Sequence, residues 1–312
     1  MSVYQGEQII SYLSAKINQP DEKSSSHWNK YHKDFGFYGN RFSGVKGFGN
    51  NEKQYSGLKK AAHLLLQIPF RRMGLKYDSF IEIDELAKAI LKRQNKAYSL
   101  DVLRQVITLS YLNQYNSVAG DTTCVIGDGF ATMSSLLLGY NNQRVILVNL
   151  TKTLLVDIWY LKLYLRDQFN SLTYLITDSG SLNEILEKTI GQKCIVAIEA
   201  QNHELIQQCP IDLAINIASM QEMNPDTVVE YFQDLKKASK YKSSIFYCCN
   251  RKEKILPDGV KVRFCDYPWE LCDKILMDEL CPWHQKYYNL KPLFYHNYDG
   301  VMIHRLAKFS SN

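Results

Sequence analysis

The chain has 312 residues, of which 46% are hydrophobic and 22% charged, with a formal net charge of +5. This composition is typical of a globular protein, and no apolar run is long enough to span a membrane. The mild positive charge comes without a long Lys/Arg run, which argues against a nucleic-acid partner but suits an anionic ligand. Eight cysteines lie scattered without a Cys-x-x-Cys pair, and no secretory leader is evident, so we expect a cytoplasmic protein with reduced thiols.

Residues 1–116 are predicted to form a mainly helical N-terminal region. A short helical pattern in residues 1–20 ends at a proline, and residues 84–92 and 99–112 repeat apolar side chains with the helical period. Between them, residues 21–57 are polar and rich in glycine and aromatic side chains. Such a long connection is either disordered or a functional lid, and its aromatic residues favour a lid.

From residue 117 onward, strand and helix patterns alternate. Strands are predicted at 122–126, 144–149, 172–177, 194–198, 212–217, 244–248 and 301–306, and helices at 132–139, 152–166, 181–190 and 225–240. This alternation predicts a mostly parallel sheet with helices on both faces, an α/β Rossmann-like domain over 117–312. The last strand is a candidate for an antiparallel edge.

A glycine-rich turn follows the first strand of this domain. Gly127, Asp128 and Gly129 separate the strand from the next helix, an arrangement that lets a nucleotide-like ligand approach bare backbone. Asn149 ends the second strand, where such folds contact a ribose. The alternative is an ordinary strand-to-helix turn that binds no ligand.

A second polar loop follows the strand at 212–217. It contains Asn216, Ser219, Gln221 and Glu222, and it lies at the carboxyl edge of the sheet, where open α/β sheets form their ligand crevice. The alternative is a simple helix start with Glu222 near the helix dipole.

The chain resembles the class I S-adenosylmethionine (SAM)-dependent methyltransferases, and more narrowly a bacterial family of sugar O-methyltransferases. The resemblance rests on residues 125–131, 148–151 and 216–223, with weaker matches at 26–28, 47–49 and 103–105. It implies SAM as cofactor and a hydroxyl of a small-molecule sugar or glycoconjugate as acceptor. Cofactor contacts are implied for Gly127, Asp128, Gly129, Asn149, Asn216 and Ser219.

The chain departs from the family pattern at three positions. Val125 replaces an acidic residue, Ala131 replaces a glycine, and Asn149 replaces the acid that usually holds the ribose. Losing that charge-assisted hydrogen bond costs on the order of 1 kcal/mol. Two alternatives therefore stay open, a degenerate member that acts as a non-catalytic scaffold and a nucleotide-cofactor oxidoreductase. Thr132 argues against the oxidoreductase, because dinucleotide sites have a glycine there.

Methyl transfer to a hydroxyl requires a group that accepts the hydroxyl proton. Glu222 is the favoured candidate base and His203 the second, while Trp28 and Tyr31 are candidate lid residues and Gln221 a candidate acceptor contact. Isolated pairs such as His203 with Glu204, or Cys281 with His284, seldom bind a metal, so no metal site is expected. No membrane partner is expected, and no feature of the sequence sets an oligomeric state.

Overall fold

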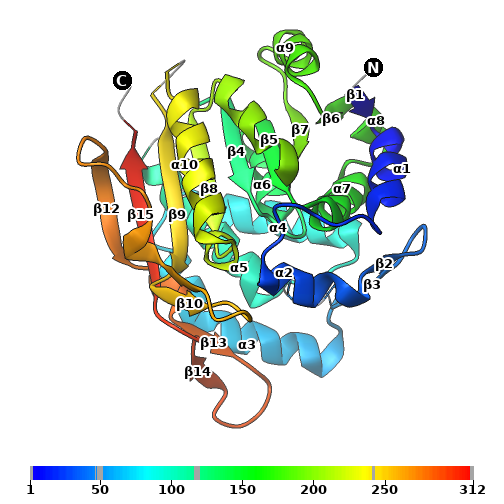
Figure 1. Cartoon of the computed structure of the whole chain (residues 1–312). Coiled ribbons are helices and arrows are strands. Elements are labelled where there is room, and N and C mark those ends of the chain that lie inside the picture. Colours follow the sequence, from blue (N-terminus) through cyan, green and yellow to red (C-terminus); the bar gives the residue numbers. More distant parts are fainter. Residues whose placement is uncertain (1–2, 46, 48–51, 116–119, 241–242, 310–312) are drawn as a thin grey trace.

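The structure is a computed structural model that describes residues 3–45, 47, 52–115, 120–240 and 243–309. Its described part is built around a nine-stranded sheet with the order β1-β6-β7-β5-β4-β8-β9-β15-β12 (Figure 1). The strands are β1 (Val3–Gln5), β4 (Thr122–Ile126), β5 (Arg144–Asn149), β6 (Thr173–Ile176), β7 (Cys194–Glu199), β8 (Leu213–Ile217), β9 (Ile245–Arg251), β12 (Lys274–Leu280) and β15 (Met302–Lys308).

The six strands from β6 to β9 pair in parallel, whereas β1, β12 and β15 are antiparallel to their neighbours. The mostly parallel sheet and the antiparallel last strand are therefore confirmed. The edge position predicted for that strand is wrong, because β12 lies beyond it. The sequence pattern did not predict β12, whose side chains are mostly exposed and give no buried apolar run.

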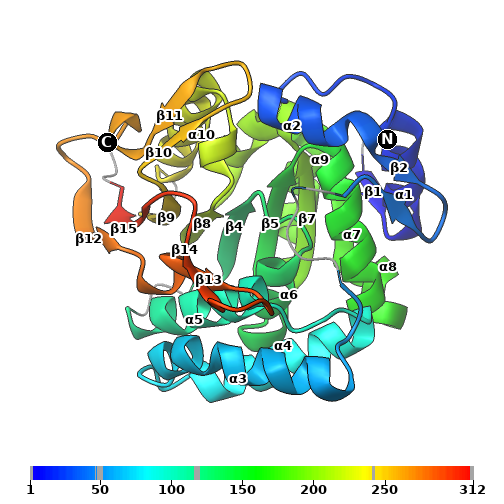
Figure 2. The same ribbon diagram turned by 90° about the horizontal axis from the view of Figure 1, so that it is seen from below.

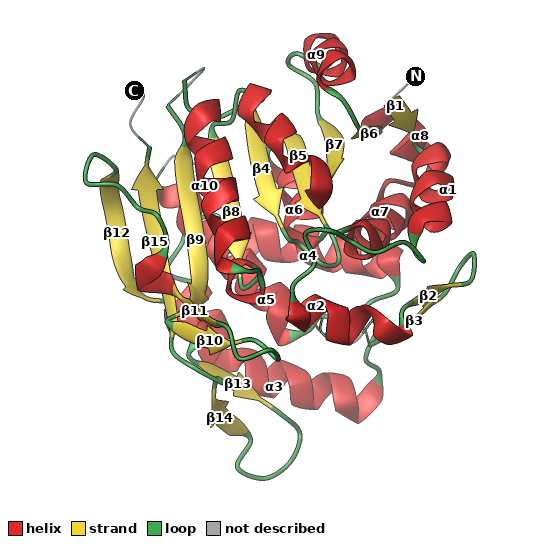
Figure 3. Cartoon of the chain, viewed as in Figure 1, coloured by secondary structure: helices red, strands yellow, loops and turns green. Residues whose placement is uncertain are grey.

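Helices cover both faces of the sheet (Figures 2 and 3). One face carries α1 (Glu7–Lys16), α4 (Phe80–Gln94), α5 (Leu100–Gln114), α6 (Thr132–Tyr140) and α7 (Thr151–Leu165), with α3 (Gly57–Gly74) packed outside and the short α8 (Phe169–Leu172) beside α7. The other face carries α9 (Ser179–Lys188), α10 (Pro225–Ala238) and the 3-10 segment η3 (Ala200–Gln208). Two large apolar cores fill the space between the sheet and these layers.

The N-terminal region shares a core with the sheet. Strand β1 pairs with β6, α1 packs against α7, and α4 and α5 pack against α6. The expected boundary at 116/117 lies outside the described residues. Ser99 caps α5, since its side chain accepts a hydrogen bond from the Val102 amide.

Residues 21–57 contain more structure than the expected loop. They hold helix α2 (Ser26–Tyr31), the 3-10 turn η1 (His32–Asp34) and a hairpin of β2 (Gly36–Phe37) and β3 (Phe42–Ser43). Aromatic side chains stabilise this segment, and Phe37 and Phe42 pack edge-on against Trp159 of α7. Phe48 and Gly49, which contribute to the family resemblance, lie outside the described residues.

Short elements complete the fold near the carboxyl terminus. They are the hairpin β10 (Glu253–Ile255) and β11 (Lys261–Arg263), the hairpin β13 (Lys286–Tyr288) and β14 (Tyr295–Asn297), and the 3-10 turns η2 (Arg166–Gln168), η4 (Met220–Glu222), η5 (Phe264–Asp266) and η6 (Pro282–His284). Among the described residues, no helix has the length and apolar character needed to cross a membrane.

The strand order reverses at β4, because β5 lies on one side of it and β8 on the other. Open parallel sheets bind ligands at such a switch point, outside the carboxyl ends of the strands. The fold therefore directs attention to the loops after β4, β5 and β8.

Candidate functional site

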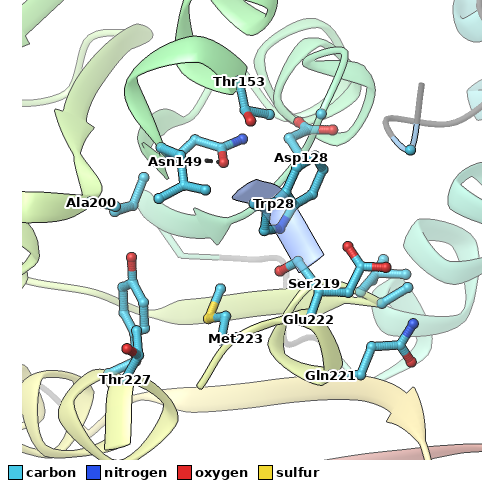
Figure 4. Close-up of a pocket in the computed structure, with 18 of the residues that line it drawn as sticks. Trp28, Asp128, Asn149, Thr153, Ala200, Ser219, Gln221, Glu222, Met223 and Thr227 are labelled. Atoms are coloured by element: carbon cyan, nitrogen blue, oxygen red, sulfur yellow. Dashed lines mark hydrogen bonds between the residues drawn. The ribbon is translucent and has the colours of Figure 1, made fainter. Parts of the chain in front are cut away.

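A cavity of about 230 Å³ lies at this switch point. Figure 4 shows Asp128, Asn149, Ser219 and Glu222 around it, with Trp28 of α2 beside them. The lining residues are Lys23, Trp28, Gly47, Asp101, Arg104, Gln105, Gly127, Asp128, Gly129, Val148, Asn149, Leu150, Thr153, Ala200, Ile217, Ala218, Ser219, Gln221, Glu222, Met223, Thr227, Tyr231, His284 and Tyr298. The cavity thus joins the two predicted loops with α2, α5 and the C-terminal segments.

The glycine turn needs backbone that side chains disfavour. Gly127 has φ 75° and Gly129 has φ 88°, both in the left-handed region. A Cβ on Gly127 would lie 2.3 Å from Oγ of Ser219, whose hydroxyl donates to the Ile126 carbonyl at 3.0 Å. Ser219 therefore holds the turn in place as well as lining the cavity.

Asn216 supports the same turn from below. Its Nδ2 donates to the Ile126 carbonyl at 2.9 Å, and its Oδ1 accepts from the Met220 amide at 3.2 Å. The side chain is fully buried and is not among the cavity-lining residues. A cofactor contact through Asn216, as implied by the resemblance, would be indirect and made through the loop that it braces.

Asp128 caps helix α6. Its carboxylate accepts hydrogen bonds from the Met133 and Ser134 amides at 3.1 and 2.7 Å and from the Ser134 hydroxyl at 2.8 Å. Burial nevertheless raises the pKa of Asp128 above its usual value. Asp128 thus fixes the turn to the helix and contributes an acidic group to the cavity wall.

Beneath the turn lies an acid that the sequence analysis missed. Asp157 of α7 is completely buried and accepts from Nδ2 of Asn149 at 2.8 Å and from the Ala131 amide at 2.7 Å. Burial, followed by the charge of Asp128, raises the pKa of Asp157 well above its usual value. The sequence signal was a single acid inside an otherwise apolar helix pattern.

Ala131 occupies a conformation that glycine would favour. Its φ is 49°, and this left-handed backbone lets its amide point at Asp157. For a residue with a Cβ this conformation costs about 1–2 kcal/mol. Position 131, where the family pattern has a glycine, is therefore occupied by a strained alanine. The hydrogen bond from its amide to the buried Asp157 carboxylate stabilises this conformation.

Glu222 lies at the cavity wall in a cluster of opposite charge. Its Oε1 is 2.7 Å from Nζ of Lys254 and 3.4 Å from Nε2 of His27. Burial alone would raise the pKa of Glu222, but the hydrogen bond from His27 and the cation of Lys254 hold it below its usual value. A carboxylate paired in this way is a weak proton acceptor.

The structure places two other predicted residues away from the cavity lining. The Nδ1 atom of His203 is hydrogen-bonded to Asp234, its Nε2 lies 3.3 Å from Glu230, and its ring packs against Tyr231. These contacts connect η3 to α10, and His203 is buried between the two segments. Tyr31 packs against the His27 ring and faces a separate surface hollow.

The far side of the cavity consists of residues without a predicted role. Arg104 of α5 donates from Nε to the Trp283 carbonyl at 3.0 Å and from Nη1 to Asp101 at 3.1 Å. Its guanidinium stacks on Tyr298, with 5.1 Å from Cζ to the ring centroid. His284 lies beside it, almost fully buried. The sequence signals for this wall were the weak match at 103–105 and the spacing of Cys281 and His284.

A second cavity of about 460 Å³ adjoins the first. Both are lined by Asp101, Arg104 and Tyr298, and the second also by tyrosines from the β13–β14 region and by His63 of α3. Arg251 approaches the same Tyr298 ring, with 5.2 Å from Cζ to the centroid. The two cavities therefore adjoin at Asp101, Arg104 and Tyr298, and the second is lined by aromatic rings and charged groups.

No protein-family model matches the chain, and no curated protein matches it. Among solved structures, it is similar to one from work on the conversion of a disulfide bond into a thioacetal group during echinomycin biosynthesis, at 9% identity, TM-score 0.41, and coverage of 66% of this chain and 82% of that one. A mutant of MtNAS is 10% identical over 97% of both chains, with TM-score 0.35. The mitomycin 7-O-methyltransferase MmcR is 10% identical, with TM-score 0.34 and coverage of 67% of this chain and 57% of its own. The Rossmann-like class rests on the strand order itself.

Proposed function

We propose that the chain is a SAM-dependent methyltransferase that acts on a hydroxyl of a sugar or glycoconjugate. The observation that supports it best is the cavity at the switch point, where the left-handed glycine turn, Asn149 and Ser219 meet. Together with the family resemblance of the same loops, this arrangement favours an adenosine-containing cofactor. SAM, when bound, supplies an electrophilic methyl group on a sulfonium ion.

The residues around the cavity suit the two ends of this cofactor differently. Gly127 and Gly129 allow close approach to the backbone, and Asn149 lines the cavity at the end of β5, where we propose that the ribose binds. Asp128 contributes an acidic group beside the turn, which suits the ammonium of a methionine end. Trp28 extends over the same space from α2 and is suited to cover the ligand from solvent.

The tyrosine-lined second cavity supports a hydroxyl-rich acceptor. Tyr55, Tyr287, Tyr288 and Tyr298 line it together with Arg104 and Arg251. Aromatic faces pack against the C–H faces of sugar rings, and guanidinium groups bind phosphate or carboxylate groups. A nucleotide sugar or an acidic glycoconjugate fits this combination.

Glu222, which the sequence analysis favoured as the base, is our candidate for a residue that contacts the acceptor. Its ion pair with Lys254 favours a positioning role, in which the carboxylate accepts a hydrogen bond from the acceptor and orders the loop after β8. Orientation of this kind can supply much of the rate acceleration in a transfer reaction.

Calorimetric titration with SAM, its demethylated product and NAD tests the cofactor. Gly129→Val places a branched side chain on the turn and should weaken SAM binding at least tenfold. Gly259→Val is the matched control, because Gly259 has φ 89° and nothing lies within 4 Å of a Cβ built there. Equal SAM affinity in both variants would refute the site. Binding of NAD alone would indicate an oxidoreductase, and binding of none of the three would indicate a scaffold.

Acceptor identity then follows from transfer of a radiolabelled methyl group to a panel of nucleotide sugars and acidic glycans. Methylated product of the expected mass supports the sugar assignment. Efficient transfer only to non-sugar hydroxyls would overturn it while leaving the cofactor assignment intact.

A further inference from the structure

Three potential metal ligands meet beside the cavity. The Sγ atoms of Cys249 and Cys281 and a ring nitrogen of His284 all lie within 4.8 Å of one another, and all three residues are buried. Cys249 comes from β9, whereas Cys281 precedes the turn η6 that ends with His284. The fold thus brings together residues that are more than thirty positions apart in the sequence.

Local geometry explains why Cys281 and His284 face the same point. The His284 amide donates to the Cys281 carbonyl at 3.1 Å, which closes a 3-10 turn. This hydrogen bond brings the two residues close together, and their ligand atoms lie within 4.8 Å of each other. Cys281-Pro-Trp-His284 therefore forms a preformed two-ligand unit, and Cys249 completes it from the neighbouring strand.

The imidazole of His284 lacks a hydrogen-bond partner. It is 5% exposed, and within the part of the chain that the structure describes neither ring nitrogen makes a hydrogen bond. Buried polar groups in proteins are nearly always hydrogen-bonded, so an imidazole without a partner needs an explanation. A bound metal ion would satisfy one nitrogen.

We propose that Cys249, Cys281 and His284 form a binding site for a zinc-type ion at the wall of the cavity. Two thiolates and an imidazole are ligands that Zn²⁺ favours, and three protein ligands with one open position are typical of catalytic zinc sites. The charges of two thiolates would balance a divalent ion. The sequence spacing of Cys281 and His284 alone did not predict a metal site, because the third ligand, Cys249, is distant in sequence.

The site borders the cavity through His284, which is one of its lining residues. A fourth ligand, water or an oxygen or sulfur atom of a bound acceptor, would have to approach from the side of His284, because Cys249 and Cys281 are fully buried and do not line the cavity. That last role rests on the proposed function, whereas metal binding itself does not. Arg104 holds the η6 segment in place through its bond to the Trp283 carbonyl, so the ligands have a rigid support.

Titration of reduced, tag-free, metal-stripped protein with Co²⁺ tests the site directly. We expect one equivalent to bind, with the visible bands of a tetrahedral ion and a thiolate charge-transfer band in the near ultraviolet. Zn²⁺ should displace it and abolish both signals. Folded wild-type protein that gives no charge-transfer band would overturn the proposal.

Substitutions then locate the ligands. Cys281→Ser and Cys249→Ser should each weaken the charge-transfer band and lower the affinity at least tenfold, and His284→Ala should shift the visible bands. Cys248→Ser is the matched control, because Cys248 is an equally buried neighbour outside the cluster. Cys272→Ser controls for the second group of potential ligands, Glu270, Cys272 and Asp273.

Three results would count against the site. The first is a charge-transfer band of undiminished intensity in both Cys281→Ser and Cys249→Ser, and the second is a band that disappears in Cys272→Ser instead. The third is a Cys249–Cys281 disulfide in protein purified without reductant, combined with no Co²⁺ uptake after reduction. Circular dichroism checks that each variant is folded. The Co²⁺ signal alone tests the proposal, whether or not the protein binds SAM.

Discussion

Asn149 and Asp157 form a buried pair in which Nδ2 of the asparagine donates to Oδ2 of the aspartate at 2.8 Å. Oδ1 of the same asparagine accepts from the Leu150 amide at 3.0 Å. Position 149, at the end of β5, therefore uses one hydrogen-bond donor and one acceptor, and the amide of an asparagine supplies both. The acid missing from position 149 is present eight residues later, on α7 and beneath the turn.

Asn149→Asp should destabilise the protein, because it brings a second carboxylate against Asp157 and removes its donor. We expect a loss of about 2 kcal/mol at neutral pH and weaker SAM binding. The family pattern alone would predict the opposite, that an aspartate restores the usual ribose contact. Because a buried acid pair raises the folded pKa, the loss should grow as the pH rises above about 4. Urea unfolding at several pH values measures it.

The swapped variant, Asn149→Asp with Asp157→Asn, is the control for this pair. It restores one acid and one amide and should recover most of the stability. Recovery of SAM binding as well would show that position 149 tolerates an acid when its neighbour is neutral. If the single and double variants are equally unstable, the pair is not the reason for the asparagine.

The sequence predicted the central architecture because buried parallel strands leave unbroken apolar runs. β4, β5 and β7 were predicted within one residue of their observed bounds. The exposed β12 and the three-residue β1 left no such run and were missed. Both are held by pairing with distant strands, which local patterns do not encode.

The candidate site was predictable only where residues follow parallel strands. The Gly127–Gly129 turn, Asn149 and the loop from Ser219 to Glu222 meet at one cavity, since the carboxyl ends of adjacent strands share an edge. Arg104 and His284 reach the cavity through tertiary packing of α5 and η6. His203 carried the right chemistry for a base, but its ring is committed to α10.

Glu222→Gln should act mainly by breaking the ion pair with Lys254. We expect SAM affinity and kcat/KM to fall together, because the loop after β8 loses its anchor. A general base would behave differently, with turnover falling roughly a hundredfold at little change in SAM affinity. That second pattern would restore Glu222 as the catalytic base.

The stability of the same variant has a defined pH dependence. The folded pKa of Glu222 is lowered, so its contribution is present above the unfolded value of about 4.3 and is lost as the pH falls through the folded value. The difference in unfolding free energy between wild type and Glu222→Gln should be constant from about pH 6 to 8 and shrink in acid. A difference that does not change with pH would mean that the carboxylate charge is not what stabilises the fold.

Lys96 gives a slope of the same sign at higher pH. Its Nζ lies 3.3 Å from the Phe130 ring centroid and 4.6 Å from that of Tyr160, and burial lowers the pKa of Lys96 to about 7. The unfolded chain therefore holds a proton that the folded chain has lost between about pH 7 and 10. Stability should rise with pH across this range by at most about 1.4 kcal/mol per unit.

Lys96→Met should remove this slope and unfold at a higher temperature than wild type at pH 7. Because tyrosines and cysteines also titrate in this range, the measured quantity is the difference between the two proteins. If the unfolding free energies of wild type and Lys96→Met change equally with pH, the lysine is solvated rather than enclosed by the two rings.

Helix α2 should respond to ligand, because Trp28 lines the cavity while Lys30 and Lys33 of the same segment are exposed. Lids that cover a transfer site commonly order when ligand binds. We expect trypsin to cleave at Lys30 and Lys33 more slowly when SAM and acceptor are present. Trp28→Ala should remove most of this protection, since the ligand then loses the side chain that connects it to α2.

Cleavage at Lys261 is the internal control. This residue lies on the exposed hairpin strand β11, away from the cavity lining, and its rate should not change with ligand. Protection at Lys30 and Lys261 together would indicate global stabilisation by ligand rather than closure of α2. Identical digestion with and without ligand, under conditions where calorimetry shows saturation, would mean that α2 is a fixed wall of the cavity.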